Sequence, residues 1–472
     1  MNGESMSDPE IPASSTVDTI AAVSTPPGRG GIGIVRLSGP LATMIAMQLV
    51  SLRQTLEHAR ARLADVLDED DADSQRIDEA VVTFFAAPNS YTAEDLVEIA
   101  AHGSPVVLDL LLRRALECGA RLAEPGEFTQ RAFLAGKLDL TQAEAVRDLI
   151  EAQTLTQARQ AASQMGGALS RRIAPVKQSL MELIALLEAG IDFAEDDIDV
   201  APQTEIGRRI TDLMPPLVAL ESSFARGRIV HDGLTLAIVG RPNVGKSSLF
   251  NRLVERDRAI VTASPGTTRD LVTERISLGG IPIELVDTAG LREALEEAEQ
   301  IGIARTHEAL ADAGLVLVVL DATQRLNEEE RELLAAVADR PALVAINKND
   351  LAGNGGSLGD DKSLADAMRI PALPTSALTG EGIADLRERI LALATGGAAA
   401  EPGLLTSLRH QQAIAAARSA FADADRANST GIPHEMILLD LYRALWALDS
   451  LTGQTTPDDI LNLIFTTFCI GK

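Results

Sequence analysis

The stretch GRPNVGKSS, residues 240–248, decides the fold of the central part of the chain. It fits the pattern Gly-x-x-x-x-Gly-Lys-Ser/Thr and lies between the apolar run 234–239 and the helix-forming segment 247–255. A strand, a glycine loop and a helix in this order bring backbone N–H groups to phosphates, and the lysine adds a positive charge. The stretch therefore predicts a nucleotide phosphate site, with Ser247 as a ligand of Mg²⁺. The expected contacts are Asn243, Val244, Gly245, Lys246, Ser247 and Ser248.

Three further elements follow in chain order and indicate a guanine nucleotide. DTAG, residues 287–290, ends an apolar run, so its acid can hold the water shell of Mg²⁺ and its glycine N–H can contact the γ-phosphate. NKND, residues 347–350, ends another apolar run. Its Asp350 can accept two hydrogen bonds from guanine, and adenine has no such pair of donors. The third element, at 376–378, is expected to close over the base. The expected contacts are Asp287, Thr288, Ala289, Gly290, Asn347, Lys348, Asp350, Ser376, Ala377 and Leu378.

The segment PGTTRD, residues 265–270, is expected to supply a second protein ligand of Mg²⁺, Thr268, once GTP orders its loop. The expected contacts of this loop with GTP are Thr262, Ala263, Ser264, Pro265, Gly266, Thr267 and Thr268.

The residue after DTAG narrows the hydrolytic mechanism. In Ras-like GTPases a glutamine there orients the attacking water, but here the position holds Leu291, which cannot bind water through a hydrogen bond. The residues alone leave four acids as candidates, and a solvated helix start is the alternative interpretation of this acidic run. No arginine finger is identifiable, and a monovalent cation held by Asn243 is another source of positive charge. The four candidate acids are Glu293, Glu296, Glu297 and Glu299.

Strand and helix patterns alternate from about residue 234 to 393, which predicts a doubly wound α/β domain. Before it, the pattern is mixed α and β to about residue 130 and then helical to about 225. Helical periodicity returns after the α/β segment. The roughly 70 C-terminal residues would form a poor core alone, so we expect them to pack on the earlier helices, around an inserted α/β domain.

Composition limits the classes of function. Lys and Arg number 42 against 68 Asp and Glu, a net charge of −26, which counts against holding nucleic acid by broad phosphate neutralisation. The two cysteines, Cys118 and Cys469, cannot form a disulfide framework. The polar N-terminus is unlike a signal peptide, and no apolar run is long enough for a membrane span. We therefore expect a cytoplasmic protein without membrane association.

Outside the nucleotide motifs, the chain resembles the tRNA-modification GTPase family MnmE, also called TrmE, from about residue 17 to 472. The most specific marks are TPPGRGGIGIVRLSG (25–39), PNSYTAEDLVEIAAHG (88–103), EPGEFTQRAFLAGKLDLTQAEAVRDLI (124–150) and the terminal FCIGK (468–472). An apolar, cysteine-containing end of this kind is expected to be docked, since solvated termini usually fray.

The resemblance implies a domain plan. After a disordered leader, 1–16, an N-terminal folate-binding and dimerisation domain similar to aminomethyltransferases would span 17–130. A discontinuous helical domain would comprise 131–230 and 396–472. The Ras-like GTPase domain would be inserted at 231–395.

The resemblance also implies an activity and partners. The family acts as a homodimer and as a heterotetramer with MnmG, and FAD is bound by that partner only. Together they add an aminomethyl or carboxymethylaminomethyl group at C5 of the wobble uridine of certain tRNAs. The carbon comes from 5,10-methylene- or 5-formyl-tetrahydrofolate, and K⁺-dependent GTP hydrolysis accompanies the modification.

Residues carried over by motif are expectations of the same kind. The water-orienting acid would be Glu299, because it lies in the stretch EQIGI. Cys469 is expected to be a buried structural cysteine, the more common fate of this residue type, with a catalytic or redox thiol as the alternative. The family often has glycine at Ala93, Ala101 and Ser104, where a Cβ atom could narrow a folate pocket. The K⁺ ligands would be Asn243, Thr262, Ser264 and Thr267, and the folate contacts Arg36, Glu98, Lys137 and Lys472.

The alternative is a switch GTPase that binds ribosomal RNA during ribosome assembly. Such proteins share the first two nucleotide motifs, but they usually carry a basic RNA-binding segment centred on Gly-x-x-Gly, which is not found after Leu393. The acidic balance and the terminal FCIGK favour the first interpretation. With a net charge of −26, the chain is expected to bind tRNA weakly, through spots such as Arg171, Arg172 and Lys177, and mainly through its partner.

Overall fold

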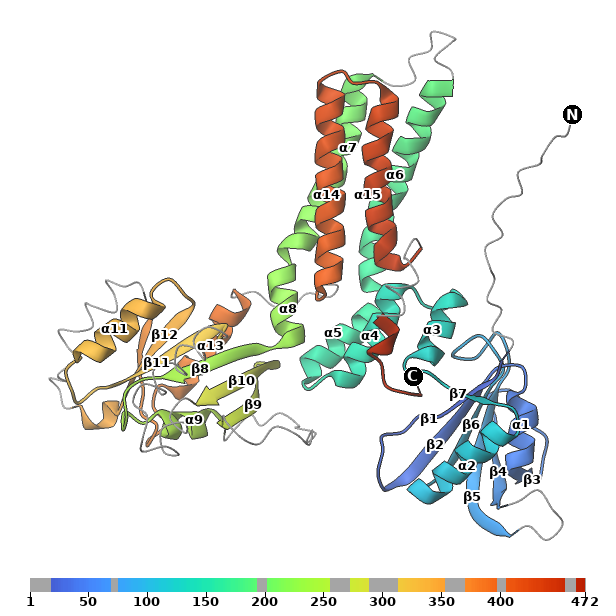
Figure 1. Ribbon diagram of the computed structural model, residues 1–472. Coiled ribbons are helices and arrows are strands. Elements are labelled where there is room, and N and C mark those ends of the chain that lie inside the picture. Colours follow the sequence, from blue (N-terminus) through green and yellow to red (C-terminus); the bar gives the residue numbers. More distant parts are fainter. Residues whose placement is uncertain are drawn as a thin grey trace, which may run out of the picture. The chain divides into compact units, whose positions relative to one another are not determined.

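The computed structural model describes residues 18–68, 75–192, 202–254, 272–287, 313–352, 370–396, 405–454 and 464–471. The chain divides into two compact units (Figure 1). The smaller unit comprises Met1–Glu144 together with Gly453–Lys472, and the larger unit is Ala145–Thr452. The last twenty residues, expected to belong with the helices, therefore group with the N-terminal segment.

The smaller unit is built on a seven-stranded sheet with the order β3-β4-β5-β6-β2-β1-β7. Alternate residues of its strands are buried, and this apolar side packs on two helices (Figure 1). The strands are β1 (Ile20–Val23), β2 (Gly30–Ser38), β3 (Val50–Leu52), β4 (Ala61–Leu67), β5 (Arg76–Phe85), β6 (Leu96–Gly103) and β7 (Arg121–Leu122). The two helices are α1 (Ala42–Leu49) and α2 (Pro105–Glu117).

Residues 464–471, at the end of the chain, are docked as expected, but in the smaller unit. Pro125, just before α3 (Glu127–Leu134), forms a β-bridge with Ile470. The carbonyl oxygen of Gly471 accepts a hydrogen bond from Ser24 Oγ at 3.1 Å. Phe465 and Phe468 are buried. The terminal motif therefore lies against β1.

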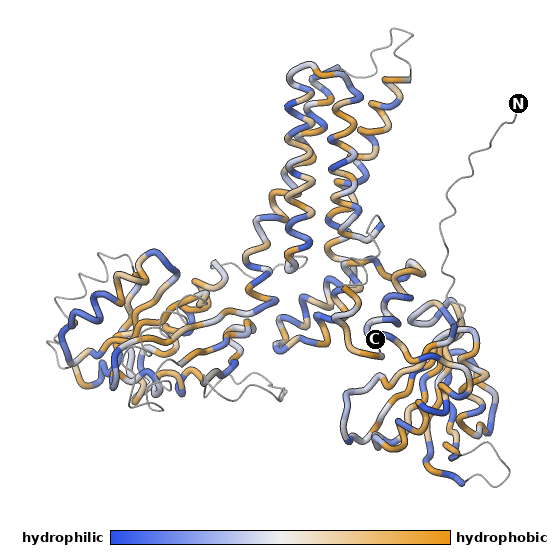
Figure 2. The backbone as a smooth tube through the Cα atoms, viewed as in Figure 1, coloured by the Kyte–Doolittle hydropathy of each residue, from blue (hydrophilic) through white to orange (hydrophobic). Residues whose placement is uncertain are grey.

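The larger unit contains long helices that share one apolar core. α14 packs against α7 and α15, and α15 packs against α6, so the segment after the second sheet returns to the helices before it (Figure 1). In Figure 2 the hydrophobic residues form stripes along these helices, the pattern of one buried face. The helices are α4 (Leu140–Glu151, which begins in the smaller unit), α5 (Leu155–Met165), α6 (Ala168–Asp192), α7 (Gln203–Ser222), α8 (Phe224–Asp232), α14 (Leu408–Ser429) and α15 (His434–Thr452).

Between α8 and α14 lies a six-stranded sheet with the order β13-β12-β11-β8-β10-β9, parallel except for β9. Leu236 and Ile238 of β8 share a core with α9 and α13, whereas Ala237 and Val239 share another core with α11. Helices therefore cover both faces, as the predicted doubly wound fold requires. The strands are β8 (Leu234–Val239), β9 (Val272–Leu278), β10 (Ile281–Asp287), β11 (Leu315–Asp321), β12 (Ala342–Asn347) and β13 (Ala372–Pro374). The helices are α9 (Lys246–Val254), α11 (Glu328–Val337), the 3₁₀ turn η2 (Asn349–Leu351) and α13 (Ile383–Thr395).

Within the residues that the structure covers, the helices are too short or too polar to traverse a lipid bilayer.

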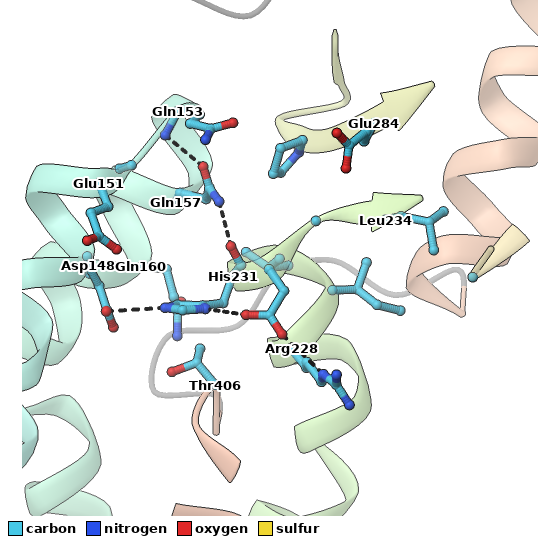
Figure 3. A pocket seen from close by; sticks show the side chains of 18 of the residues that line it. Asp148, Glu151, Gln153, Gln157, Gln160, Arg228, His231, Leu234, Glu284 and Thr406 are labelled. Atoms are coloured by element: carbon cyan, nitrogen blue, oxygen red, sulfur yellow. Dashed lines mark hydrogen bonds and ion pairs between the residues drawn. The ribbon is translucent and has the colours of Figure 1, made fainter. Parts of the chain in front are cut away.

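A cavity of about 790 Å³ lies where α8 leads into β8 (Figure 3). On its wall, His231 Nε2 is 3.2 Å from Asp148 Oδ1 of α4, and His231 Nδ1 is 2.7 Å from Asp232 Oδ1. Gln157 of α5 donates to the His231 carbonyl at 2.6 Å. A carboxylate at each ring nitrogen favours the doubly protonated imidazolium. The hydrogen bond to Asp148 raises the pKa of His231 to about 9, opposed by burial and supported by Asp232.

The pair of His231 and Asp148 predicts that the stability of the fold depends on pH. The folded-state pKa lies above the unfolded value of 6.5, so the pair stabilises fully below pH 6.5 and its contribution is lost as the pH rises through about 9. We expect His231→Gln to lower the free energy of unfolding by about 1 kcal/mol at pH 6 and by far less at pH 10. Thermal unfolding at the two pH values measures the difference, and equal destabilisation at both would contradict it.

Candidate functional site

The phosphate loop, residues 240–246, joins β8 to α9 in a conformation that requires glycine at two positions. Gly240 has φ +149°, and a Cβ atom there would lie 2.4 Å from the Val319 carbonyl oxygen. Gly245 has φ +96°, and its Cβ would lie 2.3 Å from Asn347 Nδ2. Neither position can accept a side chain without displacing a neighbour. The two glycines of the motif are thus explained by close packing.

The charged and hydroxyl groups of the motif lie on the phosphate loop and at the start of α9. Lys246 is 7% exposed, and its Nζ donates to the carbonyl oxygens of Gly240 and Arg241, each at 2.8 Å. Ser247 and Ser248 are exposed in the first turn of α9, whose N–H groups and dipole favour anions. Asn243 is exposed and has φ +62°. The loop therefore combines an ammonium group, hydroxyls and a helix N-terminus, which suit phosphate and Mg²⁺.

Asn347 connects this loop to the base loop, residues 376–378. Its side chain is almost fully buried, at 2% exposure. The amide Nδ2 donates to the Val244 carbonyl oxygen at 2.9 Å, and Oδ1 accepts from the Ala377 N–H at 3.0 Å. One side chain therefore sets the separation of the two loops.

A second link uses an acid that the sequence interpretation missed. Asp321 ends β11, and its Oδ2 accepts from Lys348 Nζ at 2.8 Å. Lys348 also donates to the Asn243 carbonyl oxygen at 2.7 Å. Burial raises the pKa of Asp321, but hydrogen bonds from Lys348 and Thr323 outweigh it and lower the pKa overall. The available signal was that Asp321, like Asp287, ends an apolar strand.

The residues expected at the base lie close together in the fold. Asp350 is in η2 and exposed, so its carboxylate is accessible to a base. The neighbouring Asn349 N–H donates to Thr375 O at 3.1 Å, beside the base loop. In that loop Ser376 is buried and Leu378 is 76% exposed.

Asp287 is the last residue of β10 and pairs in register with Ile238 of β8, so DTAG starts beside the phosphate loop. Many of the other predicted positions lie outside the described residues and remain predictions: Thr262, Ala263, Ser264, Pro265, Gly266, Thr267, Thr268, Thr288, Ala289, Gly290, Glu299 and Lys472.

The predicted folate residues Arg36 and Glu98 pair on neighbouring strands of the smaller unit. Arg36 Nη2 and Nε lie 2.7 and 3.0 Å from Glu98 Oε1, and Nη1 donates to the Gly471 carbonyl oxygen at 3.2 Å. The guanidinium is 5.9 Å from the ring centroid of Tyr91 and 5.5 Å from that of Phe128. The site thus joins a cation, an acid and two aromatic rings to the C-terminal end of the chain.

Lys137 reaches the same region from the turn after α3. Its Nζ donates to the Pro88 carbonyl oxygen at 3.1 Å and also to that of Ser90, the residue before Tyr91. Lys137 and Arg36 therefore both lie beside residues 88–91, and Glu98 pairs with Arg36.

Of the three departures from the family pattern, Ala101 is shown to lie away from the Arg36–Glu98 pair. Ala93 has φ +65°, a conformation in which glycine is usual. Ala101 belongs to the core between the sheet and its helices, on the opposite face from Glu98. Ser104 precedes α2. Cys469 is exposed, so its interpretation as a buried structural cysteine was wrong.

Comparisons with known proteins cover nearly the whole chain. A family model described as the MnmE helical domain matches residues 140–469, and one described as the GTP-binding protein TrmE N-terminus matches 19–137. A protein of Koribacter versatilis named tRNA modification GTPase MnmE is 56% identical over 460 residues, covering 96% of this chain and 99% of that protein. A protein of Heliobacterium modesticaldum with the same name is 44% identical over 472 residues, with the same coverage.

The exposed Asp350 generates a test of base recognition. We expect Asp350→Asn to weaken GTP binding and strengthen XTP binding, each by at least about tenfold, because an amide can donate to the 2-oxo group of xanthine. Titration with fluorescent nucleotides measures both affinities. Asp385→Asn, an exposed acid on α13, is the control. An unchanged preference for GTP in Asp350→Asn would contradict the assignment.

Proposed function

The chain belongs to the MnmE family of tRNA modification GTPases, and on this premise we propose that it is a K⁺-dependent GTPase that modifies the wobble uridine of tRNA. With the FAD-containing partner MnmG, it would add an aminomethyl or carboxymethylaminomethyl group at C5 of that uridine. The single observation that carries the nucleotide part is the buried Asn347, which joins the phosphate loop to the base loop.

The described residues suggest how GTP is held. Backbone N–H groups at the start of α9 and the Lys246 ammonium would bind phosphate oxygens, while Asp350 would accept from guanine. Ser247 and Thr268 are the proposed protein ligands of Mg²⁺, which would neutralise charge on the phosphates. The loop accordingly orients the nucleotide by electrostatics rather than by covalent chemistry.

The proposed K⁺ ligands are Asn243, Thr262, Ser264 and Thr267, and Asn243 supports this assignment because it lies exposed on the phosphate loop. A cation there would supply the positive charge that an arginine finger gives other GTPases. Glu299 would orient the attacking water, a role that Leu291 cannot fill.

Both assignments predict kinetic effects. We expect GTP hydrolysis to be at least about tenfold faster in K⁺ than in Na⁺, because the site must match the size of the ion. Glu299→Ala is expected to remove turnover and leave GTP binding intact. Phosphate release and nucleotide titration give the two readouts. Equal rates in the two salts would exclude the K⁺ site, and an active Glu299→Ala would exclude the role of Glu299.

We further propose that the smaller unit binds 5,10-methylene- or 5-formyl-tetrahydrofolate. Arg36, Lys137 and Lys472 would attract the glutamyl carboxylates, and Glu98 would accept from pterin donors. The proximity of Arg36 to Glu98, Tyr91 and the C-terminal Gly471 supports this placement.

The folate proposal predicts that Arg36→Ala weakens binding of 5-formyl-tetrahydrofolate by at least about tenfold, since a charged hydrogen-bond donor is lost. GDP affinity should not change. Arg113→Ala, on the exposed side of α2, is the matched control. Calorimetric titration measures both ligands, and unchanged folate affinity in Arg36→Ala would contradict the proposal.

The proposed assembly is a homodimer that forms a heterotetramer with MnmG, and tRNA would be held mainly by that partner. The net charge of −26 supports this division. One of the expected basic spots is neutralised, because Lys177 pairs with Asp449. This contact leaves less free positive charge on the helices than the sequence suggested.

The function as a whole is tested in cells that lack the protein. Mass spectrometry of their tRNA nucleosides should show loss of the C5 modification at the wobble uridine and recovery on re-expression. Unchanged wobble uridines, with accumulated ribosomal precursors, would favour the ribosome-assembly alternative.

A further inference from the structure

We propose that Arg252 is a positioning residue that fixes the base loop to the phosphate-loop helix and thereby slows release of guanine nucleotide. This inference rests on the proposed guanine-nucleotide site. Arg252 lies near the end of α9, the helix that begins at Lys246. Its Nε donates to the Ala377 carbonyl oxygen at 2.8 Å, and its Nη2 donates to that of Leu378 at 2.7 Å.

The geometry uses a property that only arginine provides. A planar guanidinium presents several donors in a rigid fork, so it can serve two adjacent carbonyl groups at once. Charged donors also form the stronger class of hydrogen bond. The same loop is held by its amide side, where Ala377 N–H donates to Asn347. Ala377 is therefore held through both its N–H and its carbonyl group.

A second arginine supports the first. Arg387 of α13 donates through Nη2 to the carbonyl oxygens of Arg252 and Leu253, at 3.0 and 2.9 Å. These carbonyls belong to the end of α9, where helical partners are missing. Leu253 also shares a buried core with Leu386. The end of α9 is consequently tied to α13, the helix that follows the base loop.

These contacts link the phosphate loop, α9, the base loop and α13 in a closed series. The phosphate loop leads into α9, Arg252 reaches the base loop, the chain continues into α13, and Arg387 returns to α9. Both ends of a bound nucleotide would therefore contact parts of one interlocked unit. Removing Arg252 breaks the link between α9 and the base loop, but it leaves Lys246 and the phosphate loop in place.

The expected signature is faster nucleotide release without a slower chemical step. In the full chain, we expect Arg252→Ala to release fluorescent GDP about tenfold faster and to raise the KM for GTP, with kcat at saturation within about twofold of the wild type. Because the loop would cover the base rather than read its 2-amino group, affinities for GDP and IDP should fall by the same factor. Asp350→Ala should instead weaken GDP more than IDP.

Stopped-flow displacement of fluorescent GDP tests the proposal, with Arg389→Ala as the matched control, an exposed arginine on α13. Arg252→Lys is the second variant, because it retains the charge and the aliphatic stem but not the fork, and it should release GDP at a rate between those of the wild type and Arg252→Ala. Wild-type release rates in both Arg252 variants would overturn the inference, as would a loss of kcat without a change in KM. A wild-type chain that binds no guanine nucleotide would instead overturn the proposed function.

Discussion

The buried side-chain amide of Asn347 is the interaction on which the nucleotide site depends. A buried amide without partners is costly, so its donor and its acceptor must both be satisfied. Val244 of the phosphate loop and Ala377 of the base loop meet this requirement. Because Asn347 Nδ2 lies so close to the phosphate loop, there is no room for a Cβ atom at Gly245. One packing constraint thus explains Gly245 of the phosphate loop and Asn347 of the NKND motif.

The parallel sheet explains why motifs far apart in the sequence meet. β8, β10, β11 and β12 end at one edge of the sheet, where ligands of doubly wound folds bind. Asp287, Asp321 and Asn347 are the last residues of three of these strands. Asp321 and Asn347 are buried at these strand ends and hold the neighbouring loops, while the apolar strands themselves form the two cores that hold the edge in place.

Much of this arrangement could be predicted from the sequence, because each motif combines residue type, spacing and a flanking strand or helix. The doubly wound sheet and the docked terminal motif followed from such local patterns. Arg252 and the pairing of Lys177 with Asp449 could not be predicted, because their partners lie on segments brought together only by tertiary packing. The exposure of Cys469 also depends on how the last residues dock. An apolar pentapeptide predicts that the end of the chain is docked, but it does not indicate which of its side chains are buried.

The most direct measurement is the GDP affinity of Asn347→Ala in the full chain, with Asn349→Ala as the control and circular dichroism to verify the fold. The structure predicts at least about tenfold weaker binding for Asn347→Ala, because the two loops lose their common partner. The control should bind like the wild type. Wild-type GDP affinity in a folded Asn347→Ala protein would contradict the claim that this amide sets the separation of the loops.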